Sequence, residues 1–359
     1  MVEVIGLDIG GANTKLAFLR TEGNAVRTLR TFTEYFPIWR RGKENLPGVL
    51  RRLSEEAVSP VRVDGVGVTM TAELSDAYQT KREGVNHILD CVEEVYGGTR
   101  IYVLDVDANL IEVEEARKEP MRVAAANWAA TGWMVSQVLK NCIVVDVGST
   151  TTSIIPIIDG RVAAAGKTDL EKLMNGELVY TGSLRTNVAA IVSSIPIRGR
   201  LARVSSELFA QSGDVHLILG NITEEEYTVD TADGRGKTFL EAAARLARVV
   251  CADIEMLTEE EIVGIAEYVY ERQLQQIIDG LRDVYRRVEP RSREDLPIVV
   301  TGLGRKFLAE KAARKAGFRK IIDLGELLGV GAALVSPSVG VALRVASEME
   351  GEIVRWRPS

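Results

Sequence analysis

Two short segments of the chain combine an acidic residue with a glycine-rich turn. The first covers Asp8–Lys15, the second covers Asp146–Ser153, and the two align without a gap. Glycine lets the backbone approach phosphate oxygens and aim N–H groups at them, while a nearby carboxylate recruits Mg²⁺ through its waters. The duplication therefore predicts a pair of phosphate-binding turns, with Mg²⁺ positioned by the catalytic candidates Asp8 and Asp146.

We expect the phosphate contacts to come from backbone N–H groups and short polar side chains of both turns. These residues are Gly10, Gly11, Asn13, Thr14, Gly148, Ser149, Thr150 and Thr151. Lys15, seven residues after Asp8, would add a positive charge to the same phosphate. A purely structural hairpin is the alternative interpretation, and a single copy of the turn would favour it. Two aligned copies favour the ligand site.

Each segment has the pattern of a β-hairpin, because an apolar run precedes the turn and another follows it. The pattern differs from the strand, turn and helix of a dinucleotide fold or a P-loop, since neither glycine signature is present here. Apolar periodicity then predicts alternating helices and strands. We expect helices near residues 47–57, 84–96, 121–139, 238–250, 259–287, 306–316 and 339–350, and strands near 61–69, 101–104 and 298–301.

Alternating strands and helices indicate an α/β protein, and the repeated hairpin indicates two related lobes with a ligand cleft between them. We expect the first lobe to comprise residues 1–138 together with a C-terminal helix at 338–359, and the second lobe to comprise residues 139–337.

Composition excludes several classes of protein. Fifty-one acidic residues against 44 basic ones give the 359-residue chain a net charge of −7, which disfavours nucleic acid as a partner. No stretch approaches 18 uncharged apolar residues, so we expect no membrane partner. Three widely spaced cysteines, Cys91, Cys142 and Cys251, favour a reduced cytoplasmic location. The sequence leaves a homo-oligomer open.

A third motif follows the predicted strand near 298–301. Val299–Gly304 carries Gly302 and Gly304 at the junction between this strand and the next helix. In order and spacing, the two turns and this segment resemble the phosphate-1, phosphate-2 and adenosine motifs of the actin, sugar kinase and Hsp70 superfamily. The resemblance implies a duplicated, two-lobed actin-like ATPase fold of ribonuclease H-like type, with Gly302 and Gly304 at the central cleft.

Further segments resemble a narrower group. They are Val68–Asp76, Lys81–Val85, Ala125–Gly132, Gly176–Thr186, Gly213–Leu217, Tyr227–Thr238 and Cys251–Asp253. Together they are similar to an archaeal and methylotroph family related to hydantoinase and oxoprolinase, whose members in methanogens are synthases of methanofuran biosynthesis. The resemblance implies transfer of an aminomethylfuranyl-methyl group from its diphosphate to the phenol oxygen of γ-glutamyltyramine, with release of diphosphate.

That reaction needs a general base, because a phenol with a pKa of about 10 stays protonated at neutral pH. The acidic candidates are Asp76, Asp214, Asp230, Asp233 and Asp253, of which we take Asp76 and Asp253 as catalytic. An ion pair with Arg245 or Arg248 explains Asp253 equally well. His216 is as compatible with a structural role as with proton transfer, and the acidic run 224–226 is interpreted as solvated surface.

The segment Gly176–Thr186 places an acid, a phenol and a fixed cation on one short loop. Arg185 is the binding candidate there, because a guanidinium suits a carboxylate such as that of a γ-glutamyl group.

Two other functions remain open at this point. One is an ATP-dependent kinase or a hydantoinase-like hydrolase of the same superfamily, and the other is a nucleotide-responsive scaffold. A sugar kinase would need an isolated catalytic aspartate in a recognisable sugar loop, and we identify none in the sequence. The density of polar motifs outside the phosphate turns disfavours a scaffold.

Overall fold

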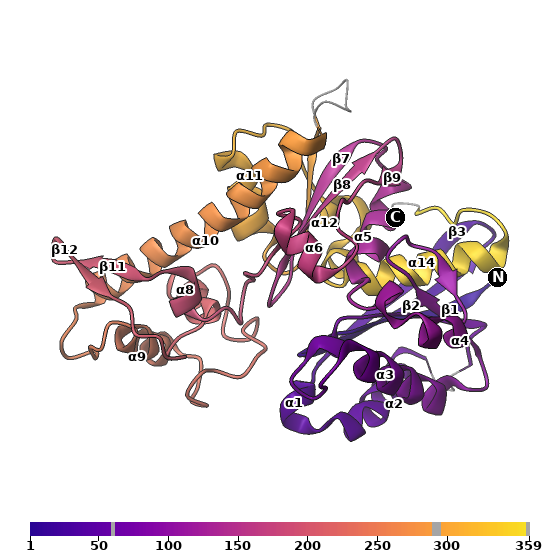
Figure 1. The fold of residues 1–359 in the computed structure, drawn as a ribbon, viewed down its shortest axis with the longest axis horizontal. Coiled ribbons are helices and arrows are strands. Elements are labelled where there is room, and N and C mark those ends of the chain that lie inside the picture. The colour runs from indigo at the N-terminus through magenta and orange to yellow at the C-terminus, as the bar shows by residue number, and fades with distance from the viewer. Residues whose placement is uncertain (59–61, 289–295, 357–359) are drawn as a thin grey trace.

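The computed structural model describes residues 1–58, 62–288 and 296–356 and folds into two lobes, each built on a mixed sheet, with a helical insertion at one side (Figure 1). In the first sheet the strands lie in the order β3 (Ala25–Tyr35), β2 (Asn13–Glu22), β1 (Glu3–Ile9), β4 (Gly65–Met70), β5 (Arg100–Leu104) and β6 (Leu110–Ile111). The helices of this half are α1 (Ile38–Arg41), α2 (Leu46–Ala57), α3 (Lys81–Tyr96), α4 (Val113–Lys118) and α5 (Asn127–Ser136).

The second sheet repeats the same plan. Its central path is β10 (Leu178–Val179), β8 (Thr152–Ile158), β7 (Cys142–Val147), β13 (Ile298–Thr301) and β14 (Ile321–Asp323), and β9 (Arg161–Val162) also pairs with β8. Its helices are α6 (Asp169–Met174), α10 (Glu259–Val288), α11 (Lys311–Lys315), α12 (Leu324–Leu328) and α13 (Val330–Leu334), and the last helix of the chain, α14 (Ser336–Glu350), follows them. In both sheets an antiparallel hairpin is followed by a parallel strand on its first member, so the repeat in sequence is also a repeat in topology.

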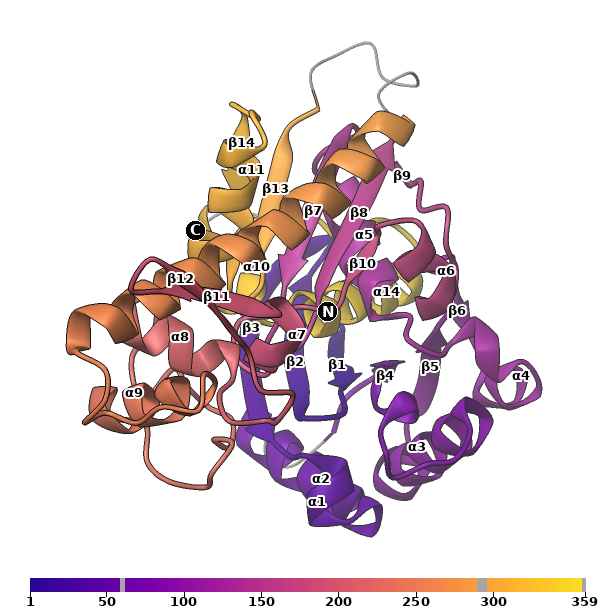
Figure 2. The same ribbon diagram turned by 60° about the vertical axis from the view of Figure 1, so that its left-hand side comes forward.

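Alternation along the strands sends apolar side chains to both faces of each sheet, because successive side chains of a strand point in opposite directions. On β1, Val4 belongs to the core between the two sheets, whereas Ile5 and Leu7 belong to the core beneath α2 and α3. The far face of the second sheet packs against α10 and α11, and Figure 2 shows α10 lying across that sheet. The result is five layers, with α5 and α14 between the sheets.

The last helix, α14, lies against β1, β2 and β4 of the first sheet and against α5. Glycine makes this close approach possible. A Cβ on Gly6 would lie 2.1 Å from the carbonyl oxygen of Ser338, and one on Gly67 would lie 2.7 Å from the Val345 side chain. Residues 357–359 of the predicted C-terminal segment lie outside the described residues, as does position 61 at the start of one predicted strand.

The predicted helix near 121–139 was too long. Residues 120–122 form a single 3₁₀ turn, and Ala125 takes a positive φ of 52°, so the α-helix begins only at Asn127. A positive φ breaks helical geometry for an L-residue, which sequence periodicity does not reveal. In the predicted helix near 306–316, residues Arg305–Glu310 are π-helical before α11 continues to Lys315.

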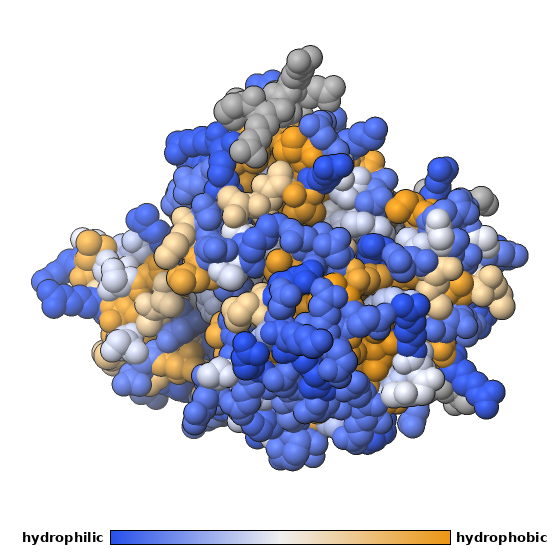
Figure 3. All heavy atoms as spheres, turned by 45° about the vertical axis from the view of Figure 1, so that its right-hand side comes forward, coloured by the Kyte–Doolittle hydropathy of each residue, from blue (hydrophilic) through white to orange (hydrophobic). Residues whose placement is uncertain are grey.

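The insertion packs around its own core and holds α7 (Val188–Ile191), β11 (Ser194–Ile197), β12 (Arg200–Arg203), α8 (Ser212–Ile218) and α9 (Phe239–Arg248). Large apolar side chains there reach the surface, among them Leu201, Leu240 and Met256. Figure 3 shows apolar patches among hydrophilic ones on the face that it draws. In the described part of the chain, no helix is both long enough and apolar enough to cross a bilayer.

Candidate active site

A cavity of about 720 Å³ lies between the two lobes and receives both glycine-rich turns. Gly10, Gly11 and Asn13 line it from the first lobe. From the second lobe, the lining residues predicted from the sequence are Gly148, Ser149, Thr150, Thr151, Arg185 and Gly302. Asp8, Lys15 and Asp146 line the same cavity. The structure therefore brings together most of the predicted site residues, although they lie far apart in the sequence.

The two turns are built in the same way. The amide of Gly10 donates to the carbonyl of Asn13 at 3.0 Å, and the amide of Gly148 donates to the carbonyl of Thr151 at 2.9 Å. The turns also meet, because the Asn13 side-chain amide donates to the Ser149 hydroxyl at 3.3 Å. Two equivalent polar turns from separate lobes thus converge on one space, an arrangement that suits a ligand with two anionic groups.

The charges of the site are concentrated on one lysine and two aspartates. Asp8 and Lys15 are direct cross-strand neighbours on β1 and β2, and Lys15 Nζ lies 3.1 Å from Asp8 Oδ2. Burial lowers the pKa of Lys15, but Asp8 and Asp146 together raise it above its ordinary value. Burial raises the pKa of Asp146 to about 6, opposed by Lys15. Lys15 therefore stays charged, and its positive charge stabilises the ionised forms of both carboxylates.

The aspartate pair fits a magnesium ion whose coordination is completed by waters and by a bound ligand. Among the described residues, none offers a hydrogen bond to the buried Oδ1 atom of Asp8. Mg²⁺ in proteins is commonly held by one or two carboxylates together with waters and substrate phosphates. The described chain contains no group of three or more Asp, Glu, His or Cys side chains that would form a cage by themselves.

The third predicted motif closes the cavity behind Asp146. Thr301 on β13 is the register partner of Asp146 on β7, and Gly302 follows with a φ of 85°. A Cβ on Gly302 would lie 2.6 Å from Asp146 Oδ1. Gly304 is not one of the described lining residues, because its amide instead donates to the carbonyl of Val147 at 3.0 Å. Gly302 therefore holds the position where only a residue without a side chain fits.

Thr14 does not line the cavity among the described residues, contrary to the prediction. It is fully buried and lies between Asn13 and Lys15, which both line the cavity. Because adjacent residues of a strand point to opposite faces, the side chain of Thr14 points away from the ligand space.

Arg185 lies at the second phosphate turn. Its Nη1 donates to the Thr150 hydroxyl at 3.0 Å, and its guanidinium stacks 4.6 Å from the ring centre of Trp39 in the other lobe. We predicted that Arg185 binds the carboxylate of the γ-glutamyl group. Its position beside this turn favours phosphate binding instead, because a guanidinium suits a phosphate group. Trp39 and the exposed Tyr180 also line the cavity; Tyr180 is the phenol noted in the segment Gly176–Thr186, whereas Trp39 was not selected from the sequence.

The predicted general bases are dispersed. Asp76 is exposed and lines the cavity. Asp253 lies outside the described lining, and its carboxylate accepts hydrogen bonds from the amides of Glu255 and Met256, so it caps a local turn. Its predicted ion-pair partners, Arg245 and Arg248, instead bind Asp233.

The other acidic candidates have structural partners. Asp214 is fully buried against Arg245 at 2.8 Å, and Asp230 pairs with Arg40 of the first lobe at 3.0 Å. His216 is buried, and burial lowers its pKa to about 3, so the ring is neutral and bonds to Gln273. These contacts give Asp214 and His216 a role in the folded core and Asp230 a role in contact between the lobes, so none of the three needs a catalytic role.

Among the charged lining residues that sequence reasoning missed are Glu225, Glu226 and Lys172. Glu225 and Glu226 are exposed, as expected, but they also reach the cavity from the insertion. Lys172 on α6 is buried with 1% exposure, and its Nζ lies 3.8 Å from the ring centre of Trp128. The capping-box pattern of Thr168 and Glu171 was the available signal for the helix, although no local pattern shows that its lysine is buried.

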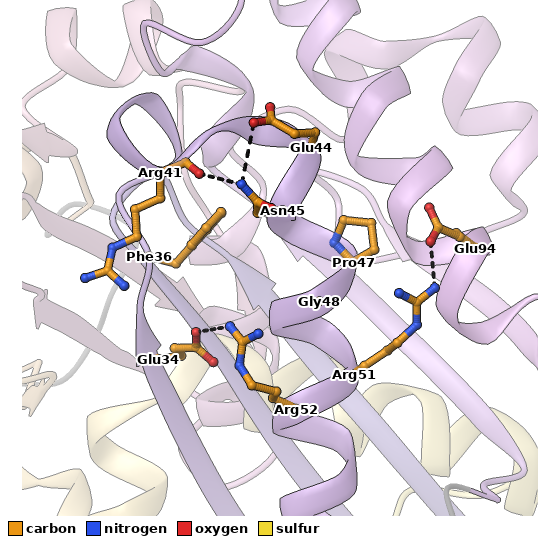
Figure 4. A pocket seen from close by; sticks show the side chains of 10 residues that line it. All are labelled: Glu34, Phe36, Arg41, Glu44, Asn45, Pro47, Gly48, Arg51, Arg52 and Glu94. Carbon is orange, nitrogen blue, oxygen red and sulfur yellow. Dashed lines mark hydrogen bonds and ion pairs between the residues drawn. The ribbon is translucent and has the colours of Figure 1, made fainter.

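A second hollow of about 530 Å³ lies beside α2 (Figure 4). Two of its three arginines already have acidic partners: Arg51 binds Glu94 at 2.6 Å, and Arg52 binds Glu34 at 2.5 Å. Because these charges are matched, the hollow has less to offer a charged ligand than the cleft between the lobes.

Comparison with known proteins identifies the group. Residues 64–342 match the hydantoinase/oxoprolinase family. A curated protein of Methanocaldococcus jannaschii is 40% identical over 97% of this chain and 99% of its own length. A second, from Methanococcus vannielii, is 38% identical over 60% of this chain and 96% of its own length. Both are named (4-{4-[2-(γ-L-glutamylamino)ethyl]phenoxymethyl}furan-2-yl)methanamine synthase. The chain belongs to this synthase family.

Solved structures bear on the fold alone. A nucleotide-free acetone carboxylase superposes with a TM-score of 0.53 at 10% identity, covering 95% of this chain and 70% of the other. Component A of the (R)-2-hydroxyglutaryl-CoA dehydratase of Acidaminococcus fermentans gives 0.47 at 10% identity, covering 98% and 100%. The two sheets of identical plan and the acetone carboxylase likeness confirm the predicted two-lobed, actin-like α/β fold of this family member.

Proposed function

We propose that this synthase joins an (aminomethylfuranyl)methyl diphosphate to the phenol oxygen of γ-glutamyltyramine, forming the aryl ether and releasing diphosphate. The single observation that carries the proposal is the convergence of two equivalent polar turns on one cavity in a near full-length relative of the named synthases. The printed product contains a phenoxymethyl-furan ether, so the bond to be formed joins a phenol oxygen to a furanylmethyl carbon.

A furanylmethyl carbon tolerates positive charge, so the bond to the leaving group can break ahead of bond formation. The enzyme's main task is then to stabilise the departing diphosphate. The two turns, with the hydroxyls of Ser149 and Thr150, and Lys15 line the cavity and would supply hydrogen-bond donors and a positive charge for this task. Arg185, fixed on Thr150, would add a guanidinium.

Asp8 and Asp146 would hold Mg²⁺ in this scheme. When bound, the ion would neutralise charge on the diphosphate oxygens. The amine of the furan substrate is a cation. The exposed carboxylates of Glu225 and Glu226 at the cavity carry the opposite charge and would attract it. Trp39 and Tyr180 offer aromatic surface to the two rings.

The test combines binding with turnover. Calorimetric titration with Mg²⁺ present should show diphosphate binding without a preference for ATP, and the two substrates should yield the ether and diphosphate. The variant Asp8→Asn should lose at least about 10²-fold in turnover while it remains folded at the assay temperature. Tight ATP binding with weak diphosphate binding and no ether would move the assignment to a kinase or nucleotide switch.

A further inference from the structure

A buried amine without a hydrogen-bonding partner lies in the wall of the cleft. Lys172 is 1% exposed and lines the cavity, and among the described residues none accepts a hydrogen bond from its Nζ. Buried lysines are rare unless they are paired, because a charged ammonium loses its hydration there. An unpaired one in a ligand cleft is therefore costly for the fold unless it is neutral or meets a group of the substrate.

The charges around Lys172 do not supply a tight partner. Glu177 of the adjoining segment is committed to Arg287 of α10 and to the amides of Ala165 and Gly166. Asp169, on the same helix α6, binds Lys81 of the first lobe at 2.8 Å.

Two cations also influence the site. Lys167, which precedes α6, and Arg287 of α10 disfavour another positive charge. Burial, the largest effect, lowers the pKa of Lys172 to about 8, although Glu177 and Asp169 act to raise it. At pH 7 about one-tenth of this lysine is thus a free base, and at pH 8 about half.

The position of Lys172 relative to the phosphate turns follows from α5. Lys172 Nζ lies 3.8 Å from the ring centre of Trp128, and Thr131, three residues further along the same helix, donates to Asp146 Oδ2 at 3.4 Å. Residues three apart on a helix are neighbours, with Cβ atoms about 5–6 Å apart. The amine and the aspartate of the second turn are therefore both contacted by one turn of α5, and both line the same cavity.

We propose that Lys172 is the general base that deprotonates the phenol of the acceptor substrate. The inference rests on the proposed ether synthesis. The phenol O–H proton passes to the neutral Nζ of Lys172, the phenol oxygen forms a bond to the furanylmethyl carbon, and the carbon–oxygen bond to diphosphate breaks with its electron pair leaving on diphosphate. The ammonium then releases its proton to solvent.

Asp76, the acidic candidate that also lines the cavity, is a weaker choice. It is exposed, whereas Lys172 is enclosed with an aromatic ring beside it. Water competes for an exposed carboxylate, whereas the enclosed Nζ of Lys172 is held against Trp128.

The first test measures the pH dependence of kcat/KM for ether formation. A base must be neutral to act, so activity should rise with pH and level off above about pH 8. A lysine that instead bound diphosphate as a cation would give the opposite slope, with activity falling above the same pH. The falling slope would overturn the inference.

Three variants separate base from charge and from structure. Lys172→Met and Lys172→Arg should each lose about 10²–10⁴-fold in kcat/KM, because neither supplies a neutral amine. Lys172→Ala should regain activity with added ethylamine in proportion to the concentration of its free-base form. Lys140→Met, at an exposed lysine of the same lobe, is the matched control and should keep wild-type activity and profile.

The outcomes distinguish this inference from the proposed function. Wild-type protein that forms no ether defeats the proposed function itself. Wild-type protein that forms the ether, while Lys172→Met does so at the same rate or while Asp76→Asn alone removes the pH dependence, defeats only the role of Lys172. As a readout independent of turnover, NMR of ¹³C-labelled lysine should show one resonance titrating near pH 8 that is missing in Lys172→Met. Titration only at the ordinary lysine value would also overturn the inference.

Discussion

Replacing Gly302 by alanine tests how the carboxylate of Asp146 is held in place. Gly302 follows β13 with a φ of 85°, and an added Cβ would lie 2.4 Å from the carbonyl oxygen of Val147 and 2.6 Å from Asp146 Oδ1. Non-bonded carbon and oxygen atoms need more than 3 Å. The aspartate must therefore retreat by roughly 1 Å or the loop must move.

The magnitude has two parts. A positive φ costs an alanine about 1 kcal/mol relative to glycine. Overpacking against the β7 backbone and the carboxylate adds about 1–3 kcal/mol. Gly199, in the β11–β12 turn, has a φ of 75° and no described atom within 4 Å of an added Cβ, so Gly199→Ala carries only the first part. The pair of variants isolates the contacts with Val147 and Asp146 from the cost of the positive φ.

Urea unfolding and ether formation are the assays. Gly302→Ala should lose about 2–4 kcal/mol of unfolding free energy and about 10²-fold in kcat/KM, since a displacement near 1 Å has that effect on reacting groups. Gly199→Ala should lose about 1 kcal/mol and keep its kcat/KM. Equal losses of stability in the two variants, with kcat/KM unchanged in Gly302→Ala, would refute the view that this glycine sets the position of Asp146.

Three further predictions concern charged groups. Arg185→Ala should raise KM for the furanylmethyl diphosphate about 10-fold, and a larger rise for γ-glutamyltyramine in steady-state kinetics would return Arg185 to carboxylate binding. Asp214→Ala should cost about 3–5 kcal/mol in urea unfolding because it leaves Arg245 buried, and a cost below about 1 kcal/mol would contradict this. Between pH 8 and 10.5 the unfolded chain holds a proton on Lys172 that the folded chain has released. The unfolding free energy should therefore rise with pH across this window, by up to about 3 kcal/mol, and Lys172→Met should flatten the rise.

The local features of the site were predictable from the sequence because their geometry is local. A glycine turn between two apolar runs fixes a hairpin, so the register that opposes Asp8 to Lys15 follows from the spacing of those two residues. The same holds for β13, whose bounds the apolar run predicted correctly at residues 298–301. Alternation of side chains was the information not applied to Thr14, and applying it would have removed that residue from the predicted contacts.

The remaining site residues depend on contacts between distant segments. Lys172 is distinctive only because Trp128 packs beneath its amine, and nothing within the capping-box helix predicts that contact. Tertiary contacts also decide that Asp253 has no ion pair with Arg245, because Arg245 binds Asp214 and Asp233 in the folded chain. Burial and partner choice are tertiary properties, so acidic residues of similar local context could not be ranked from sequence.

The duplicated turns differ in one charge, and that difference ties the chemistry to the position of the lobes. Asp8 faces Lys15 across its hairpin, whereas the equivalent partner of Asp146 is the neutral Ser153. Lys15 of the first lobe therefore serves the aspartates of both lobes, which leaves the pair one net negative charge for the proposed Mg²⁺. Separating the lobes would take this cation away from Asp146 and leave the carboxylate pair incomplete. Closure of the cleft and readiness of the carboxylate pair are thus coupled through a single side chain.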